Sequence, residues 1–322
     1  YERNPADPRI QHALTLEVDE YGNVLKEAAV GYGRRTDADG DALQAEDRAK
    51  QRLIHITCTE NGFTHPVLDK NDDYRAPLPA ESRTYEVRKA DQERSDDGPT
   101  VLFDLDALRG HIDRAGDGEH EVPCEDLAFD KARQQIEAGP EERKSDHFRR
   151  LIEHVRTVYR KDDLSDLLPL GHLEPLALPG ESYKLAFTAG LLTRVFDDRV
   201  SDSMLQNEGG YVQSRALKAN GRFPASDADD CWWIPSGLSS FSRNPADSAA
   251  TEWAQARQHF FLPRRYRDPF GQDAFVDFDA NDLLPVRTED AVGNTVAARN
   301  DYRVLQPVEA TDPNGNRSQL RC

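Results

Sequence analysis

A five-residue pattern, Asp-x-x-Gly-Asn, occurs three times in this chain and constrains its fold more than any other feature. The copies read DEYGN, DAVGN and DPNGN, and their defining residues are Asp19, Gly22, Asn23, Asp290, Gly293, Asn294, Asp312, Gly315 and Asn316. Glycine supplies the positive φ that a short hairpin loop requires, asparagine tolerates left-handed geometry nearby, and aspartate accepts backbone N–H groups as an Asx turn. The pattern therefore predicts three hairpin turns, centred at Gly22, Gly293 and Gly315.

The residues around these turns have the alternation of β-strands. Before the first turn, Leu14, Leu16 and Val18 share one face, and β-forming residues resume after it. Further strands are expected within residues 52–59 and 83–88, and from residue 270 onwards strand and turn repeat with the same turn chemistry. We therefore expect a mainly β fold of antiparallel hairpins with a few helices.

Helices are expected in three segments whose apolar residues recur at intervals of three and four. These segments are residues 125–138, 141–160 and 246–261. Residues 183–196 are ambiguous between a strand that enters a short helix and a continuous helix, which Gly190 would weaken. Along the chain we expect a β-hairpin segment at 1–36, a β-rich segment with polar loops at 37–123, a helical insertion at 124–180, and a second β segment with one helix at 181–322.

The charge balance limits the partners. The 322 residues include 41 Lys and Arg against 59 Asp and Glu, which gives a formal net charge of -18. Sequence-independent binding of phosphate backbones needs a basic face, and a transmembrane helix needs about 20 apolar residues in a row. We expect neither a nucleic-acid partner nor direct membrane insertion. Because the chain starts with Tyr1 and its last turn is followed by few residues, we expect a piece of a longer polypeptide, with any export signal outside it.

Metal sites are not indicated by the sequence. The cysteines Cys58, Cys124, Cys231 and Cys322 form no CxxC pair and are interpreted as free thiols. The residues Asp312, Asn314, Asn316 and Ser318 have the spacing of the first half of a calcium loop, but the turn interpretation is favoured. His147 and His154 are seven residues apart and have no third ligand nearby in the sequence. We expect neither a metal nor another cofactor.

Three other features suggest chemistry, and each has a simpler explanation. Trp232 and Trp233 would suit a sugar-stacking platform, although packing at a corner is favoured. The cluster Arg264, Arg265 and Arg267 would suit an anion, although salt bridges to nearby aspartates are favoured. The sequence IPSG lacks the context of a nucleophile elbow. No catalytic residue is assigned, and we do not expect an enzyme.

Several longer motifs occur in a fixed order. They are YERNPADPRIQHALTLEVDEYGNVLKEAAVGYGRR, LLTRVF, GGYV, DCWWIPSG, ARQHFFLPRRYRDPFG, DAVGNTVAARNDYRVLQP and DPNGNRS. Through this set the chain resembles the middle-to-late region of the B component of the bacterial Tc insecticidal toxin complexes. The resemblance covers about residues 1–35 and 183–320.

The resemblance implies a structural role. In that family the B and C components build a hollow shell of β-strands from YD or Rhs repeats, which encloses the toxic C-terminal region of C. A β-propeller elsewhere in B docks to the pore-forming A component. This sequence has neither a propeller signature nor the self-cleavage site of C, and its turns depart from the fuller GxxxRYxYDxxGR repeat.

Two functions therefore stay open. The first is a non-catalytic shell segment of a secreted toxin, which contacts the rest of the B chain and the C component, with the A component bound through regions outside this segment. The second is a carbohydrate-binding or hydrolase module of a secreted Rhs-type surface protein, with its site near Trp232. The first predicts a broad surface without convergent polar groups, and the second predicts a compact pocket lined by tryptophan and carboxylates.

Overall fold

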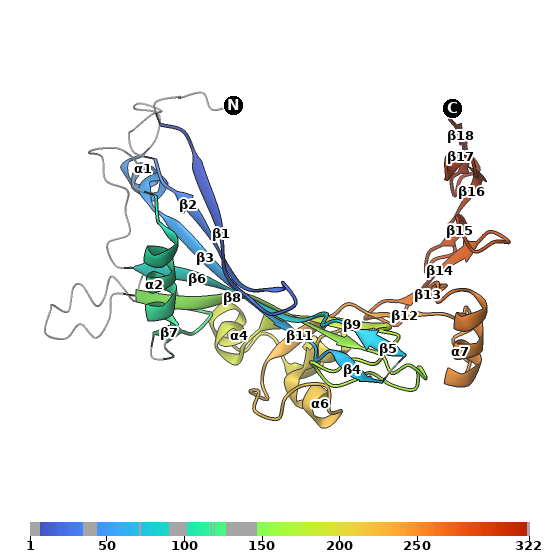
Figure 1. The fold of residues 1–322 in the computed structure, drawn as a ribbon, viewed down its shortest axis with the longest axis horizontal. Helices are drawn as coiled ribbons and strands as arrows, with labels where there is room; N and C mark the ends of the chain where they lie inside the picture. Colours follow the sequence, from blue (N-terminus) through green and yellow to red (C-terminus); the bar gives the residue numbers. More distant parts are fainter. Residues whose placement is uncertain are drawn as a thin grey trace, which may run out of the picture. The chain divides into compact units, whose positions relative to one another are not determined.

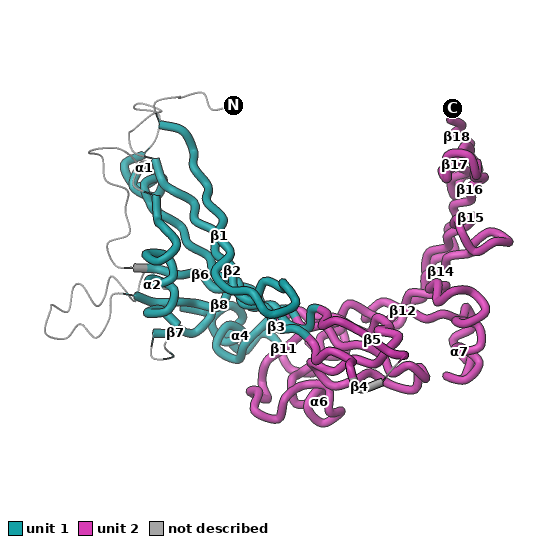
Figure 2. The backbone as a smooth tube through the Cα atoms, in the orientation of Figure 1, with its two compact units in different colours: residues 1–63, 79–155, 187–200 teal, residues 64–78, 156–186, 201–322 magenta. Residues whose placement is uncertain are grey.

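The computed structural model describes residues 7–34, 44–70, 72–89, 102–116, 118, 120–126 and 147–320. The chain forms two compact units, and each is assembled from separate stretches of sequence (Figure 2). Unit 1 comprises residues 1–63, 79–155 and 187–200, and unit 2 comprises residues 64–78, 156–186 and 201–322.

Unit 1 is built on a sheet with the strand order β1-β2-β3-β6-β8 (Figure 1). The strands are β1 (Ile10–Val18), β2 (Val24–Tyr32), β3 (His55–Phe63), β6 (Pro79–Lys89) and β8 (His147–Tyr159), and β8 belongs to this unit as far as residue 155. The first four strands pair antiparallel. The short strand β7 (Glu121–Val122) pairs with β8 in parallel.

Helix α2 (Leu105–Ala115) closes the hydrophobic core of unit 1. It begins at Asp104, whose side chain accepts the backbone N–H of Ala107 and thereby satisfies one of the free donors of the first turn. Leu108, Ile112 and Ala115 lie on one face and are buried against β-strand residues of the same core. The other helices in the described part of this unit are α1 (Ala45–Arg52) and α4 (Ala189–Phe196).

Unit 2 contains the end of β8, which is followed in the order of the sheet by β9 (Pro179–Phe187), β11 (Trp232–Pro235) and β10 (Val212–Gln213). Strand β9 belongs to this unit as far as residue 186. Its core holds Val158, Tyr183, Leu217, Phe223 and Trp233. Strands β4 (Val67–Lys70) and β5 (Asp73–Arg75) form a separate pair. The helices are α5 (Asp202–Asn207), α6 (Ser214–Ala219) and α7 (Ala249–Gln258).

A seven-stranded antiparallel sheet completes unit 2 (Figure 1). Its strands are β12 (Leu238–Ser240), β13 (Arg265–Arg267), β14 (Asp273–Phe278), β15 (Pro285–Glu289), β16 (Thr295–Asp301), β17 (Gln306–Thr311) and β18 (Arg317–Gln319). Each strand pairs with the next along the chain, so the sheet is a meander of local contacts. We call it the meander sheet.

The expected fold class, mainly antiparallel β with short helices, is confirmed. The helix expected at residues 246–261 is α7, and residues 183–196 do form a strand followed by a helix, β9 and α4. The helix expected at residues 125–138 lies largely outside the described residues. No helix in the described part of the chain is long and apolar enough to span a membrane.

The helix expected at residues 141–160 is wrong, because the described part of this segment is strand β8. The three- and four-residue spacing of apolar residues does not mark a buried helix face here, because Ile152, which belongs to that spacing, is 48% exposed. The buried positions near the end of the strand alternate instead, at His154, Arg156 and Val158. Within the proposed helical insertion, the described residues 124–126 and 147–180 contain no helix.

Candidate functional surface: a two-faced sheet with an aspartate at each turn

The DAVGN turn shows how the repeated motif closes a hairpin. The Asp290 carboxylate accepts the backbone N–H groups of Val292 at 3.0 Å and Asn294 at 2.8 Å, and the Asn294 side chain donates to its second oxygen at 2.9 Å. Gly293 has a φ of +86°, and no atom lies within 4 Å of where its Cβ would be. A hydrogen bond from the Asn294 side chain, and to a lesser extent one from the Asn294 backbone N–H, lowers the pKa of Asp290 below its ordinary value. The turn is therefore stabilised by its own residues.

The other two predicted turns have the same geometry. Asp19 and Asp312 each accept hydrogen bonds from the backbone N–H groups two and four residues ahead. Each also accepts a hydrogen bond from the side chain of the asparagine four residues ahead. The φ of Gly22 is +82° and that of Gly315 is +81°. They join β1 to β2 and β17 to β18, as the DAVGN turn joins β15 to β16.

The meander sheet contains more of these turns than the three-copy motif indicates. All its hairpins from β13 to β18 start with an aspartate, and the five are spaced 11 residues apart, at Asp268, Asp279, Asp290, Asp301 and Asp312. The Asp-x-x-Gly-Asn motif does not include the turns at Asp268, Asp279 and Asp301, because these turns lack the Gly-Asn pair. The interval of 11 residues was the signal that would have found them.

The three additional turns keep the aspartate and vary the rest. Asp268 accepts the N–H groups of Phe270 and Gln272, with a φ of +79° at the glycine between them. Asp279 accepts three backbone N–H groups, and the left-handed position is taken by Asp282 with a φ of +54°. In the turn that begins with Asp301, Leu305 takes the left-handed position with a φ of +55°. The aspartate is thus the constant element, and glycine is replaceable at a cost in backbone strain.

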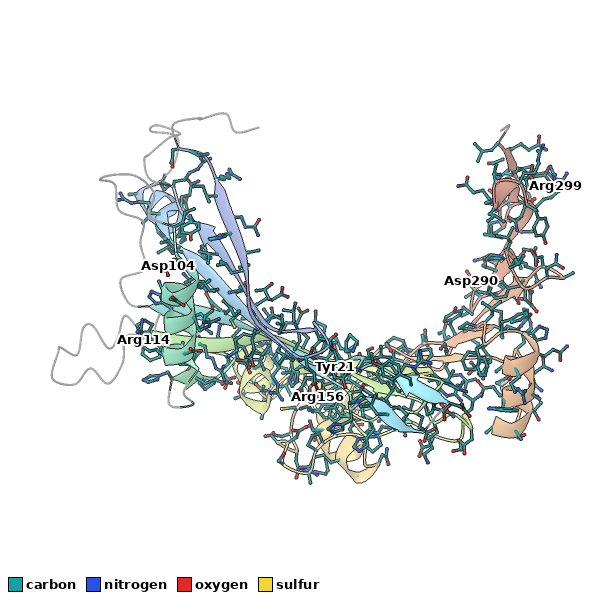
Figure 3. All side chains as sticks on the ribbon, in the orientation of Figure 1. Tyr21, Asp104, Arg114, Arg156, Asp290 and Arg299 are labelled. Atoms are coloured by element: carbon teal, nitrogen blue, oxygen red, sulfur yellow. The ribbon has the colours of Figure 1, made fainter. Side chains whose placement is uncertain are left out.

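One face of the meander sheet carries a row of ion pairs, and we call it the ionic face. Asp277 pairs across the strands with Arg287. Arg299, which is labelled in Figure 3, pairs with Glu309. Pairs between residues of the sheet are Arg267–Asp273 at 2.8 Å, Arg287–Glu289 at 3.1 Å, Arg287–Asp277 at 3.6 Å, Arg299–Glu309 at 3.9 Å and Arg317–Glu309 at 4.0 Å. Arg243, from outside the sheet, contacts Asp277 at 2.7 Å and Glu289 at 2.6 Å. Exposed pairs contribute about 0–1 kcal/mol each, so this row favours the correct strand register more than it adds stability.

The opposite face of the same strands carries no charge, and we call it the apolar face. Val276 pairs with Thr288, which pairs with Val296 on its other side, and Ala298 pairs in the same way with Ala310. The members that the strand register places on this face in β14 to β18 are Ala274, Val276, Thr288, Val296, Ala298, Ala310 and Ser318. None of them is buried, and Val296 is 42% exposed. The sheet thus presents a partly uncovered apolar face, which is typical of a surface that contacts another polypeptide.

The region proposed for carbohydrate stacking is inside the protein. Trp232 is 2% exposed and Trp233 is 3% exposed. The indole N–H of Trp233 donates to the Ser214 hydroxyl at 2.9 Å, and the Arg156 guanidinium lies over its ring. The packing interpretation is confirmed, and neither ring is available to stack on a sugar.

The arginine cluster is used for salt bridges, as the sequence favoured. Arg264 contacts Asp282 at 2.6 Å, and Arg265 and Arg267 contact Asp273 at 3.4 and 2.8 Å. The hydrogen bond from Arg267 lowers the pKa of Asp273. Each of the three cationic groups therefore already has an aspartate partner, and Arg265 and Arg267 share theirs.

The two histidines considered as metal ligands lie on strand β8, where seven residues span roughly 23 Å. His147 lies 3.0 Å from a nitrogen of His111, and His154 lies 2.7 Å from a carboxylate oxygen of Glu81. The described residues contain no group of three or more His, Cys, Asp or Glu side chains placed to hold a metal. Cys58 and Cys124 form no disulfide bond, and Cys322 lies outside the described residues.

Comparison with known proteins gives one sequence match and several matches of fold. Residues 1–75 match the family described as the insecticide toxin TcdB middle/C-terminal region. No curated protein matches the chain.

The fold matches include the crystal structure of TcdB2-TccC3, with 20% identity and a TM-score of 0.58 over 100% of this chain and 13% of that one. The crystal structure of TcdB2-TccC3-Cdc42 matches 98% of this chain and 13% of its own, with 20% identity and a TM-score of 0.55. The Photorhabdus luminescens Tc holotoxin pore matches 98% of this chain and 13% of its own, with 21% identity and a TM-score of 0.58. This chain thus spans 13% of the length of each of these solved chains. The sequence match over residues 1–75 and the fold shared over the remaining length confirm that the chain resembles the middle/C-terminal region of Tc toxin B components.

Proposed function

We propose that this chain is a non-catalytic wall segment of a secreted Tc toxin B component, and that it helps to enclose the toxic C-terminal region of the C component for delivery. Its partners are then the C component and the remainder of the B chain, with the A component bound through regions outside this segment. The observation that carries the proposal is the meander sheet, which has an ionic face and a partly uncovered apolar face.

A sheet with two such faces suits a wall. A sheet that forms a single-layered wall has no second layer from the same chain to cover its apolar face. That face is covered only when other parts of the assembly, or the enclosed cargo, contact it. The ionic face needs no partner protein, because its charges are neutralised by pairs within the sheet and by Arg243, which lies between β12 and α7 in the same unit. The self-contained aspartate turns let the strands repeat without support from other elements.

The turn aspartates are poorly suited to acid–base catalysis. A carboxylate that accepts two backbone N–H groups and is held below its ordinary pKa, as Asp290 and Asp312 are, is a poor proton donor or acceptor near neutral pH. The tryptophans that a carbohydrate site would require are buried. The wall function is therefore favoured over the carbohydrate-binding or hydrolase alternative.

Protease protection of the cargo tests the wall function. The full B component that contains this chain is co-produced with its C component, and the toxic C-terminal region of C is probed by limited proteolysis. We expect that region to resist cleavage in the complex and to be cleaved rapidly when produced alone. Equal cleavage in the two samples would contradict the enclosure. A Gly293→Val change in the B chain should increase cleavage of the cargo if the hairpin that it disturbs is part of the wall.

A further inference from the structure

Unit 2 contains a cleft that the wall function does not use. It lies between strand β5, the loop at residues 162–176 and the start of helix α7. Its volume is about 760 Å³, within the ~300–1,000 Å³ typical of ligand sites. This volume is large enough for two or three amino-acid side chains.

The lining combines apolar groups with carboxylates. Pro175, Leu176 and Trp253 supply the apolar part, and Leu176 is 40% exposed even though it is a large aliphatic residue. Asp73 and Asp162, together with Asp163, supply the carboxylates. The cleft also includes the first residues of α7, but the positive partial charge of a helix N-terminus, about +0.5, is small beside several carboxylates. Two cationic groups contact the same lining, because Arg75 donates to the Pro175 carbonyl and the Arg257 guanidinium lies 4.8 Å from the centroid of the Trp253 ring. The three carboxylates outnumber these two cations, so the cleft is suited to a further cation with an apolar neighbour.

The loop that bears Leu176 is held in place before any ligand arrives. The Arg75 guanidinium donates to the Pro175 carbonyl at 3.0 and 2.6 Å, and the Asp162 carboxylate accepts the Leu176 N–H at 3.1 Å. The next residue, Ala177, has a φ of +52°, a strained conformation for a residue with a Cβ. Preorganisation of this kind lowers the entropy cost of binding.

The α7 side of the cleft is anchored as well. Glu252 of α7 forms a buried ion pair with Arg160, and Arg160 also donates to the Leu164 carbonyl at 2.9 Å. Leu164 is buried and has a φ of +61°. The backbone conformation of the loop is therefore fixed at a second residue as well. Both walls are thus tied to the same core, which also contains Phe241.

We propose that this cleft binds a segment of a partner polypeptide that carries an arginine or lysine next to a large apolar residue. The apolar side chain packs on Leu176 and Trp253, and the cation lies among the carboxylates of Asp73 and Asp163. Charge complementarity selects such a segment from other peptides, because an acidic residue would meet like charges in the cleft. This binding site is independent of the wall function.

Peptide titration tests the site with the chain as it exists. The probe is the acetylated and amidated tripeptide Leu-Arg-Leu, and the matched control is Leu-Glu-Leu with the same caps. Calorimetry and tryptophan fluorescence should show saturable binding of the arginine peptide and at least tenfold weaker binding of the glutamate peptide. Arginine amide alone separates a peptide site from a site for any small cation, and we expect it to bind more weakly than the tripeptide. Equal or stronger binding of arginine amide would contradict a peptide site.

Two isosteric variants complete the test. Asp163→Asn keeps the oxygen that accepts the Ser165 N–H and removes the charge, so it should weaken binding of the arginine peptide about tenfold. Asp230→Asn removes an exposed charge of unit 2 away from the cleft and should leave the affinity unchanged. The proposal is wrong if both variants bind equally well, or if neither peptide saturates below about 5 mM, which corresponds to only ~3 kcal/mol of binding free energy.

Discussion

Arg160 and Glu252 form a buried, two-pronged ion pair, in which the guanidinium nitrogens donate to the two carboxylate oxygens at 3.0 and 3.1 Å. The residues are 5% and 8% exposed, and Glu252 also accepts the backbone N–H of Phe241 at 2.9 Å. The pair connects the residue after strand β8 to helix α7 within the core of unit 2. It thereby fixes where α7 lies in that unit.

Removal of one partner should be costly. Arg160→Met leaves the Glu252 carboxylate buried without its cation, and we expect a loss of about 3–5 kcal/mol in the free energy of unfolding, measured by urea denaturation. The double change Arg160→Met with Glu252→Leu removes both charges and should cost clearly less than the single change. Arg299→Met, at an exposed pair, should cost less than about 1 kcal/mol. A double variant as unstable as the sum of the single variants would contradict a coupled pair.

Gly293→Val tests the turn argument. The space around this Cβ is empty, so the whole cost comes from the φ of +86°, and we expect a loss of about 1–3 kcal/mol in thermal or urea unfolding. Gly171 has a φ of +80° and is therefore unsuitable as a neutral control. Gly110→Ala in helix α2 is suitable, since its φ is not in the left-handed region, and it should stabilise the protein by about 0.5–1 kcal/mol. Equal stability of Gly293→Val and the unmodified chain would refute the turn argument.

The sequence predicted the features whose causes are local. The hairpins at Gly22, Gly293 and Gly315 depend on five consecutive residues, so their chemistry is visible in the chain itself. Strand β8 was predicted as a helix because its character depends on distant partners. His154 and Arg156 are buried there only because Glu81 and Asp227 lie beside them, 73 and 71 residues away along the chain. No local pattern indicates such pairs.

The two functional surfaces differ in the same way. The two faces of the meander sheet follow from strand alternation and the 11-residue interval, both of which can be read along the chain. The cleft brings together Asp73, Asp163 and Trp253 from stretches that are separated by more than 80 residues. The two units are also assembled from non-contiguous stretches, which a division along the sequence does not capture.

The Asp301 turn should make stability depend on acid pH. Hydrogen bonds from the Arg303 side chain and backbone lower the pKa of Asp301 from 3.8 to about 2. Because the folded pKa lies below the unfolded value, the stabilisation is fully present above about pH 4 and is lost as the pH falls towards 2. The melting temperature of Asp301→Asn should therefore lie below that of the unmodified chain at pH 6 and approach it at pH 2. Asp198→Asn, an exposed change outside the aspartate turns of the meander sheet, is the control.

The two faces of strand β16 offer a matched test of the wall function. Val296 lies on the apolar face and Ala297, the next residue, lies on the ionic face opposite Arg287, so a glutamate at either position makes the same chemical change in a different environment. Both side chains are exposed in this chain, and each variant should change its own stability by less than about 1 kcal/mol.

In the assembled toxin the two variants should differ. If the apolar face is covered there, Val296→Glu places a charge in a desolvated contact and should lower the yield of the complex between the full B and C components. Ala297→Glu gains a nearby cation at Arg287 and should assemble normally. The yield of complex is measured by size-exclusion chromatography after co-production, and the melting temperature of each free chain shows whether folding itself has changed. Equal yields from the two variants, with equal melting temperatures, would mean that the apolar face stays uncovered in the toxin, and the wall function would lose its main physical support.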